Sequence, residues 1–232
     1  MEELELAENQ MQQCCVKVDD SLKLDAHYWS IQYDNKTTAW DLGMASTALV
    51  HFVNSIEDKS LKILIPGCGN AHEADYLLSK GFENITLIDI APTLVAQLKL
   101  KYAENNNINI VLGDFFELEG SFDVIIEQTF FCAISPLLRS VYAQKMYALL
   151  SESGVLAGLL FNRTFEFDGP PFGGNIQEYQ SIFENAGLEV IEMAPTNMSV
   201  LPRLHSEAFF KVKKSNKPIP ENATVTNACS IK

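Results

Sequence analysis

Residues 61–70 read Leu-Lys-Ile-Leu-Ile-Pro-Gly-Cys-Gly-Asn, and the rest of the predicted fold is arranged around this stretch. A short run rich in β-branched residues enters a turn with two glycines, and a helical pattern follows at residues 71–80. Such a run predicts a buried parallel strand, and glycines allow a ligand to approach the backbone closely. Because ligands of open α/β sheets bind at the carboxyl ends of such strands, we expect a ligand site at this turn.

Two kinds of ligand compete for the turn. A dinucleotide requires the pattern G-x-G-x-x-G, in which the pyrophosphate sits on the helix N-terminus. Gly67 and Gly69 fit this pattern, but the third position is His72, and the neighbouring Glu73 disfavours a phosphate. A nucleoside ligand without phosphates, such as S-adenosylmethionine, needs only the close backbone approach. The alternative is a purely structural role, in which the two glycines form a tight strand-to-helix turn without a ligand, since short glycine motifs often match by chance.

The composition indicates one globular domain and excludes several classes of protein. A chain of 232 residues with 47% hydrophobic residues can bury a full core. The 17 basic against 30 acidic residues give a net charge of −13, which argues against a nucleic-acid-binding protein. No apolar run approaches the roughly 18 residues of a membrane span. We therefore expect no nucleic-acid partner and no membrane partner.

The cysteines and histidines indicate neither a metal site nor a disulfide framework. The five cysteines show no C-x-x-C spacing, and the four histidines are scattered along the chain. We expect a surface or packing role for each histidine. The acidic beginning of the chain lacks the basic and apolar regions of a signal peptide. These features favour a cytoplasmic protein, which we expect to be a monomer.

Strands and helices alternate along the chain. Beyond the strand at residues 61–65, strands are predicted at 85–89, 108–112, 122–126, 155–161, 188–193 and 207–212. Helices are predicted at 45–56, 71–80, 92–104, 136–150 and 176–185. This order predicts an α/β sandwich with a mostly parallel sheet and an antiparallel last pair of strands. The domain is expected at 23–214, between a flexible N-terminal arm (1–22) and a disordered C-terminal tail (215–232).

Polar side chains follow three consecutive strands. Asp89 ends the second strand, 22 residues after Gly67, where a carboxylate can accept hydrogen bonds from ribose hydroxyls. A helix cap is the alternative role for Asp89. Asp114 ends the third strand and can accept from an adenine amine, with Phe115 and Phe116 covering the ring; the alternative is a solvated turn aspartate beside two core phenylalanines. Gln128 follows the fourth strand, where it can meet the methionine or ribose part of the ligand.

These motifs resemble those of the thiopurine S-methyltransferase family of class I S-adenosylmethionine-dependent methyltransferases, in particular its thiol and halide methyltransferase branch. The resemblance covers residues 27–213 and rests on Trp29, Trp40-Asp41-Leu42-Gly43, Pro66-Gly67-Cys68-Gly69, Asp89, Gly113-Asp114-Phe115-Phe116, Thr129-Phe130-Phe131-Cys132-Ala133 and Gly169-Pro170-Pro171-Phe172. It implies a Rossmann-like class I methyltransferase sandwich with a seven-stranded, mostly parallel sheet whose last strand is antiparallel. It also implies S-adenosylmethionine as the cofactor and a small-molecule methyl acceptor.

The resemblance assigns roles to individual residues. The cofactor-binding residues that it implies are Trp29, Tyr33, Trp40, Gly67, Asp89, Asp114, Phe115 and Gln128. Gly67 would contact the methionine end, Asp89 the ribose, and Asp114 with Phe115 the adenine. Two positions depart from the family pattern: relatives often carry tyrosine or arginine at Gln128 and tryptophan at Tyr33. For the two tryptophans, the residues alone favour ordinary core burial.

The predicted acceptor pocket is small and apolar. Phe130, Phe131, Pro171 and Phe172 fall on two loops at the ligand-binding end of the sheet, and Arg203 is the nearest basic residue. No residue is assigned as a general base, because a soft acceptor needs mainly alignment and desolvation. We expect Cys132 to pack rather than to act as a nucleophile.

The predicted reaction is methyl transfer to small thiols or hydrogen sulfide by in-line displacement, with halides as weaker acceptors. Alternatives are a thiopurine-type or other small-molecule methyltransferase, and a non-catalytic nucleoside-binding domain of the same fold. A nicotinamide oxidoreductase is a further alternative, disfavoured by His72 and Glu73. Gly67, Asp89 and Asp114 favour cofactor binding over the non-catalytic alternative.

Overall fold

The computed structural model describes residues 23–216; the predicted arm at 1–22 and residues 217–232 of the predicted tail lie outside this range. Seven strands form the sheet: β1 (Ile63–Pro66), β2 (Ile85–Asp89), β3 (Ile108–Leu112), β4 (Phe122–Gln128), β5 (Leu150–Phe161), β6 (Leu188–Pro195) and β7 (Glu207–Lys214). The α-helices of the described chain are α2 (Ala26–Asp34), α3 (Thr47–Asn54), α4 (His72–Ser79), α5 (Pro92–Lys101), α6 (Arg139–Leu149) and α7 (Ile176–Asn185). Short 3₁₀ turns are η1 (Phe115–Glu117), η2 (Pro136–Leu138) and η3 (Leu201–Arg203).

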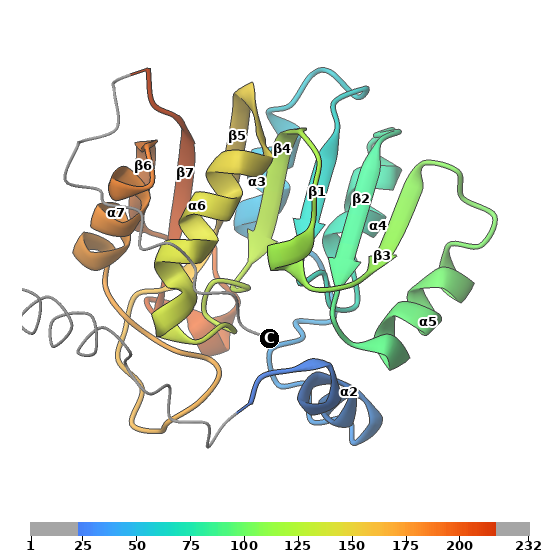
Figure 1. Cartoon of the computed structure of the whole chain (residues 1–232), viewed down its shortest axis with the longest axis horizontal. Coiled ribbons are helices and arrows are strands. Elements are labelled where there is room, and N and C mark those ends of the chain that lie inside the picture. The colour runs from blue at the N-terminus through green and yellow to red at the C-terminus, as the bar shows by residue number, and fades with distance from the viewer. Residues whose placement is uncertain (1–22, 217–232) are drawn as a thin grey trace, which may run out of the picture.

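The strands lie in the order β3-β2-β1-β4-β5-β7-β6 (Figure 1). Strands β1 to β5 pair in parallel, whereas β7 pairs antiparallel with both β5 and β6. All four residues of β1 are buried, as expected for a strand covered on both faces. The predicted seven-stranded, mostly parallel sheet with an antiparallel last strand is confirmed.

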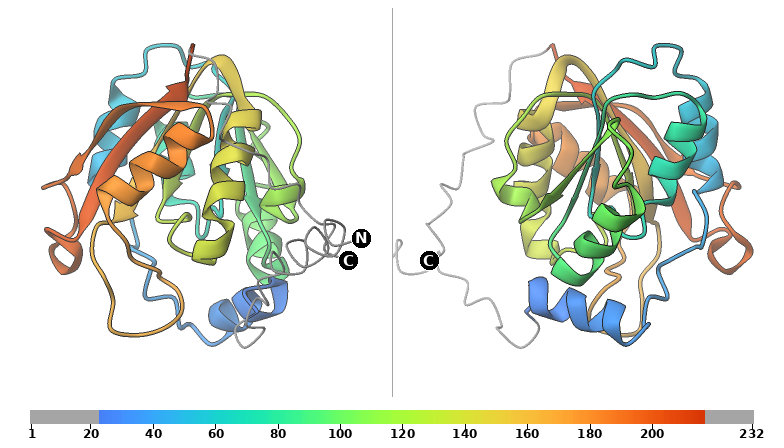
Figure 2. Two further views of the ribbon diagram at one scale, coloured as in Figure 1. Left: turned by 60° about the vertical axis from the view of Figure 1, so that its left-hand side comes forward. Right: turned by 90° about the vertical axis from the view of Figure 1, so that its right-hand side faces the viewer.

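Helices cover both faces of the sheet (Figures 1 and 2). Leu49, Leu77 and Leu94 from α3, α4 and α5 belong to one buried apolar cluster, and Tyr142 and Phe183 from α6 and α7 belong to a second. Each fully buried side chain of this kind stabilises the fold by about 1.5–3 kcal/mol. Helix α2 lies next to α5, beyond the carboxyl ends of the central strands (Figure 1).

The register of the strands places the polar strand ends at one edge. Pro66 of β1 pairs with Ile88 of β2, and Asp89 pairs with Leu112 of β3. The turn after β1, the carboxylate that ends β2 and the turn after β3 therefore lie level with one another. Helix α2 covers this carboxyl-terminal end of the strands (Figure 1).

The structure corrects the sequence prediction at two elements. Helix α2 was not predicted, because its sequence lacks a regular apolar periodicity and none of its residues is fully buried. In the structure, Trp29 and Tyr33 of this helix are partly buried against the apolar cluster of α3, α4 and α5. It begins at the side chain of Asp25, whose Oδ1 accepts hydrogen bonds from the N–H groups of His27 and Tyr28 at 3.0 Å. Strand β5 begins at Leu150 rather than at residue 155, because Leu150 pairs with Phe122 of β4.

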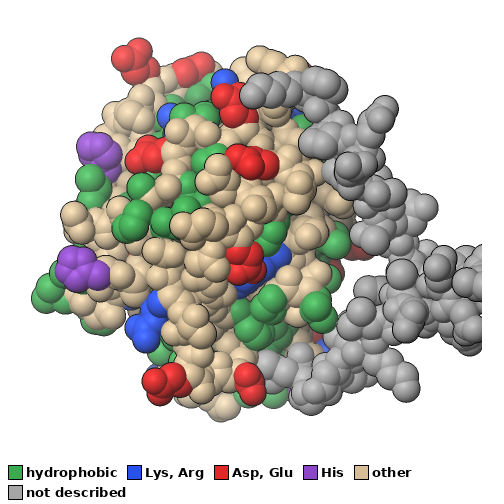
Figure 3. Space-filling model, turned by 90° about the vertical axis from the view of Figure 1, so that its left-hand side faces the viewer, with side chains coloured by type: hydrophobic (Ala, Val, Ile, Leu, Met, Phe, Trp, Pro, Cys, Tyr) green, Lys and Arg blue, Asp and Glu red, His purple; other side chains and the backbone are tan. Residues whose placement is uncertain are grey.

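The outer face around edge strand β6 carries scattered carboxylates and few basic side chains (Figure 3). Glu189 and Glu192 lie exposed on this strand, and such charges oppose pairing with a further strand. No helix in the described range is both long enough and apolar enough to cross a bilayer. Over the same range, no group of three or more potential ligand side chains is placed to hold a metal ion.

Candidate functional site

The turn after β1 is built from residues in left-handed conformations. Gly67 has φ +54°, Gly69 has φ +52°, and Ala71, which precedes α4, has φ +58°. A β-carbon on Gly67 would lie 2.2 Å from Cδ2 of Phe130, and one on Gly69 would lie 3.5 Å from the Tyr33 hydroxyl. The turn is thus closed by Phe130 and approached by Tyr33, and Gly67 cannot carry a side chain in this packing.

Asp89 lies directly beside the turn. Its Oδ2 accepts a hydrogen bond from the N–H of Gly69 at 3.2 Å, and its Oδ1 accepts from the N–H of Ala91 at 3.0 Å. Burial raises the pKa of this carboxyl, while these backbone hydrogen bonds act in the opposite direction. The bond to Ala91 shows that Asp89 also holds the start of α5. A carboxylate has about four acceptor sites, so both oxygens can still accept from ribose hydroxyls.

A cavity of about 60 Å³ opens at the turn. It is lined by Trp40, Asp41, Ile65, Pro66, Gly67, Cys68, Gly69, Asn70, His72, Glu73 and Gln128. A larger hollow of about 530 Å³ lies at the amino ends of β2 and β3, at the opposite edge of the sheet. We place the functional site at the smaller cavity, because ligands of such sheets bind at the carboxyl edge.

Three aromatic side chains, Trp29, Tyr33 and Trp40, form an aromatic cover over the turn. The ring of Trp40 meets Trp29 edge to face at 5.4 Å and Tyr33 edge to face at 5.8 Å between centroids. Burial and the nearby Asp89 raise the pKa of the Tyr33 hydroxyl far above its ordinary value, so this group stays neutral. The structure therefore brings together the three N-terminal aromatic residues predicted for the site.

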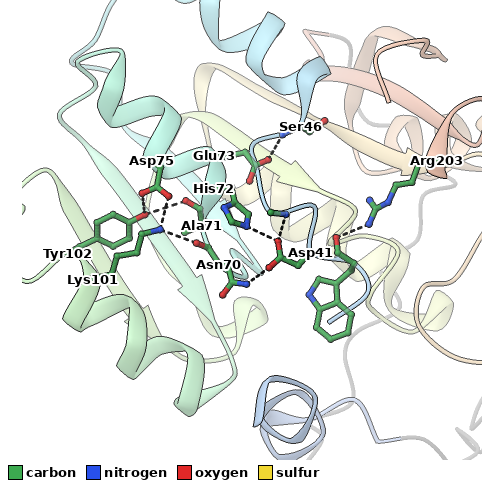
Figure 4. Close-up of polar contacts among 12 residues, drawn as sticks. Asp41, Ser46, Asn70, Ala71, His72, Glu73, Asp75, Lys101, Tyr102 and Arg203 are labelled. Atoms are coloured by element: carbon green, nitrogen blue, oxygen red, sulfur yellow. Dashed lines mark hydrogen bonds and ion pairs between the residues drawn. The ribbon is translucent and has the colours of Figure 1, made fainter. Parts of the chain in front are cut away.

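Asp41 ties this cover to the glycine turn (Figure 4). Its Oδ1 lies 2.7 Å from Nε2 of His72 and accepts from the N–H of Gly43 at 2.8 Å, while Oδ2 accepts from the Asn70 amide. Burial acts to raise the pKa of Asp41, but these hydrogen bonds outweigh it and lower the pKa overall. His72, for which a packing or surface role was expected, is instead part of the cavity wall.

A second bond fixes the same segment. The N–H of Ser46, just before α3, donates to Oε1 of Glu73 on α4 at 3.0 Å (Figure 4). Burial raises the pKa of Glu73. Sequence reasoning used Glu73 only as an argument against a phosphate, and it missed Asp41 as a contact because its partners lie about 30 residues away.

Arg203 holds Trp40 from the other side. Its Nη2 donates to the carbonyl oxygen of Trp40 at 2.7 Å, and its Nη1 donates to Oε1 of Glu207 at 3.1 Å. The buried guanidinium also lies over the ring of Phe161, 5.2 Å from its centroid. Arg203 therefore joins the segment of Trp40 to the start of β7, and its charge is already paired with that of Glu207.

The residues predicted for the adenine lie at the turn after β3. Asp114 is exposed, and its Oδ1 accepts from the N–H of Phe116 at 2.9 Å. Phe115 is buried and meets Phe130 edge to face at 5.3 Å. Gln128, from the end of β4, lines the cavity. The predicted residues that follow or end β2, β3 and β4 thus all lie at the carboxyl ends of the parallel strands.

None of the five residues predicted for the acceptor pocket, Phe130, Phe131, Pro171, Phe172 and Arg203, lines this cavity. Phe131 is fully buried in the core, edge to face with Tyr142 at 5.1 Å and with Tyr179 at 5.2 Å. The two predicted loops do lie together, because the N–H of Phe172 donates to the carbonyl oxygen of Cys132 at 2.7 Å.

Further contacts fix these two loops. Pro171 is half-buried in the loop that Arg139 holds through bonds to the carbonyl oxygens of Phe172 and Gly173. Cys132 has the packing role expected of it, with its buried thiol accepting from the N–H of Phe161 at 3.3 Å.

Replacing Asp89 by alanine is expected to weaken binding of S-adenosylhomocysteine by about 1.5–3 kcal/mol, the range for hydrogen bonds to a charged group. Calorimetric titration of the folded variant measures this loss. Asp58→Ala is the matched control, because Asp58 also accepts from a backbone N–H two residues away but lies before β1, at the opposite edge. An unchanged dissociation constant for Asp89→Ala would contradict the assignment.

The fold is that of the class I S-adenosylmethionine-dependent methyltransferases. The solved structures that resemble the chain include magnesium protoporphyrin IX methyltransferase of Synechocystis with bound S-adenosylhomocysteine (TM-score 0.66, 14% identity, covering 82% of this chain and 98% of that one). Another comes from echinomycin biosynthesis (TM-score 0.67, 16% identity, covering 83% and 94%). At these identities the likeness is one of fold.

The family follows from the sequence matches. The thiopurine S-methyltransferase family model matches residues 24–216, and the chain belongs to this family. Probable thiol methyltransferase 2 of Arabidopsis thaliana is 30% identical over 193 residues, covering 81% of this chain and 85% of the relative. Thiocyanate methyltransferase 1 of Brassica oleracea is 28% identical over 197 residues, with the same coverage. The protein is thus an enzyme that uses S-adenosylmethionine as its methyl donor.

Proposed function

We propose that this enzyme transfers the methyl group to small thiols or hydrogen sulfide, with halides as weaker acceptors and thiopurines as further ones. One observation carries the proposal: no lysine or arginine lines the cavity at the glycine turn. Its one histidine, His72, is paired with Asp41, and the nearby Arg203 is paired with Glu207. A phosphate or carboxylate acceptor that enters this cavity therefore meets no unpaired cation among the lining residues, whereas a soft thiolate needs none.

The residues of the site supply binding, orientation and exclusion of water. Gly67 and Asp89 would hold the methionine and ribose parts of S-adenosylmethionine, and the aromatic cover would exclude water. The cofactor would supply a methyl group on a sulfonium sulfur, which leaves as the neutral thioether S-adenosylhomocysteine as the acceptor bonds to the methyl carbon. Aromatic faces favour a cation, and desolvation strengthens a thiolate nucleophile. A thiol acceptor ionises with a pKa of about 8.5 and thus requires little help from a general base.

The acceptor is tested by methyl transfer from labelled S-adenosylmethionine to a matched panel of thiols, sulfide, halides, thiopurines, amines and catechols. The proposal expects the highest kcat/KM with thiols or sulfide. The relatives named as thiol and thiocyanate methyltransferases support this order. Transfer confined to amine or oxygen acceptors would overturn the proposed acceptor and leave the methyltransferase assignment intact.

We also propose that the aromatic cover closes over the bound cofactor. Saturating S-adenosylhomocysteine is expected to change the indole emission of Trp29 and Trp40 and to protect residues 25–46 from proteolysis. Asp41→Ala is expected to remove this protection and to weaken binding by about 1–2 kcal/mol, since it deletes hydrogen bonds to a partly exposed charge. Asp34→Ala, at the exposed end of α2, is the control. If ligand changes neither emission nor protease sensitivity, the cover does not close.

A further inference from the structure

Glu127, the residue before the last of β4, carries a carboxyl group whose hydrogen bonds reach neither the glycine turn nor the aromatic cover. Glu127 is completely buried, and its Oε2 accepts hydrogen bonds from the N–H of Phe130 at 2.5 Å and of Phe131 at 3.3 Å. Its Oε1 has no hydrogen-bond partner among the described residues. Burying a polar group is costly unless it is hydrogen-bonded, so this carboxylate is retained at a cost to the fold.

The neighbouring strand is shaped to admit this side chain. Gly158 of β5 pairs with Glu127, and a β-carbon on Gly158 would lie 2.9 Å from Cγ of Glu127 and 2.5 Å from Phe210. Any larger residue at position 158 would clash with Phe210 and with both the backbone oxygen and the side chain of Glu127. The position of Glu127 is therefore built by two strands.

The turn that Glu127 holds is strained. Thr129 has φ +59°, a left-handed conformation that is an outlier for a β-branched residue and is strained. Its N–H donates to the carbonyl oxygen of Leu159 at 3.1 Å. Phe130 and Phe131, whose N–H groups donate to Glu127, are the two residues that follow Thr129. These hydrogen bonds offset the strain and hold the turn in its left-handed conformation.

The strained turn places two side chains of the site. It sets the ring of Phe130 against Gly67, and it follows directly on Gln128, which lines the cavity. We propose that Glu127 is a positioning residue of the cofactor site, which holds the turn at residues 128–131 so that Phe130 and Gln128 shape the wall beside Gly67. This inference rests on the proposed placement of the cofactor at Gly67.

The proposal is tested by titrating S-adenosylhomocysteine into variants of the whole protein. Glu127→Met keeps the shape of the side chain but removes the acceptor, and it is expected to raise Kd and the KM for S-adenosylmethionine at least about tenfold. Glu127→Gln retains an acceptor oxygen and is expected to bind within about threefold of the wild type. A Gln variant as weak as the Met variant would overturn the proposal.

Relief of strain gives a second readout. Glycine adopts positive φ freely, so adding Thr129→Gly to Glu127→Met is expected to restore most of the lost affinity. No recovery would overturn the proposal, because Glu127 would then act on the ligand without the turn. If Glu127→Met does not fold alone, the same comparison is made in the Thr129→Gly background. There the proposal expects equal affinity with and without Glu127, and a tenfold difference would overturn it.

Asp123→Leu is the matched control for lost stability. Asp123 lies at the other end of β4 and accepts from the N–H of Lys62 at 3.0 Å and from the Ser151 hydroxyl at 2.9 Å. Its replacement is expected to lower stability and leave Kd unchanged, whereas an equal rise in Kd would assign Glu127 a merely structural role. Failure of the wild-type protein to bind S-adenosylhomocysteine would instead refute the proposed site, independently of Glu127.

Discussion

Replacing Gly67 by alanine is expected to destabilise the fold by about 2–4 kcal/mol and to abolish measurable cofactor binding. Part of the cost is the left-handed backbone, since φ is +54°. The larger part is steric, because the new β-carbon would lie 2.2 Å from the ring of Phe130. Packing of that ring against Phe115 and Tyr142, with centroids at 5.3 Å and 6.0 Å, opposes its displacement.

Gly81→Ala separates the two parts of this cost. Gly81 follows α4 with φ +84°, and nothing lies within 4 Å of the position of its β-carbon. Its replacement is expected to cost about 1 kcal/mol through the backbone alone. Urea unfolding measures both variants, and titration with S-adenosylhomocysteine measures binding. Equal destabilisation by the two substitutions would show that Phe130 does not close the turn.

The protein is expected to lose stability between about pH 5 and pH 8 because of Glu127. Burial raises the pKa of this carboxyl from an ordinary 4.5 to about 8. The native state thus keeps a proton that the unfolded state releases in this range. Fewer protons are bound in the unfolded state, so the free energy of unfolding falls as pH rises and levels off above pH 8. The expected loss is on the order of 3–5 kcal/mol.

Glu127→Gln is expected to remove most of this slope, since the amide does not ionise. Urea unfolding of both proteins at pH 5.5, 7 and 8.5 measures the difference. Burial also raises the pKa of Asp89 and Glu73, so a smaller slope of the same sign is expected to remain. Asp123→Asn serves as the control on the same strand. Parallel pH profiles for the wild type and Glu127→Gln would contradict the prediction.

The elements that the sequence predicted best are those whose pattern is dictated by burial. The all-apolar β1 and the alternation of strands and helices require a covered parallel sheet. Helix α2 has no such pattern, and its start depends on the local cap by Asp25. The start of β5 depends on pairing with Phe122 across the sheet, which no local signal carries.

The residues of the site also differ in whether a local sequence signal marks them. Asp89 is predicted because a carboxylate at a strand end is visible in the sequence. Glu127 carries the same signal, but only the next residue, Gln128, is predicted to contact the cofactor. The pair of Asp41 and His72 joins residues 31 positions apart and has no local signal. Phe131 was expected in the pocket beside Phe130, but consecutive residues of a turn point in different directions, and Phe131 enters the core.

The bond from Arg203 to the carbonyl oxygen of Trp40 joins residues 163 positions apart. Chains grow from the amino end, at about 5–20 residues per second, so Trp40 leaves the ribosome many seconds before its partner. Arg203 is itself fixed by Glu207, the first residue of β7, so the tie forms only once the last strand has been made. Nascent chains are therefore expected to acquire a closed active site only late in their synthesis, after β7 has been made.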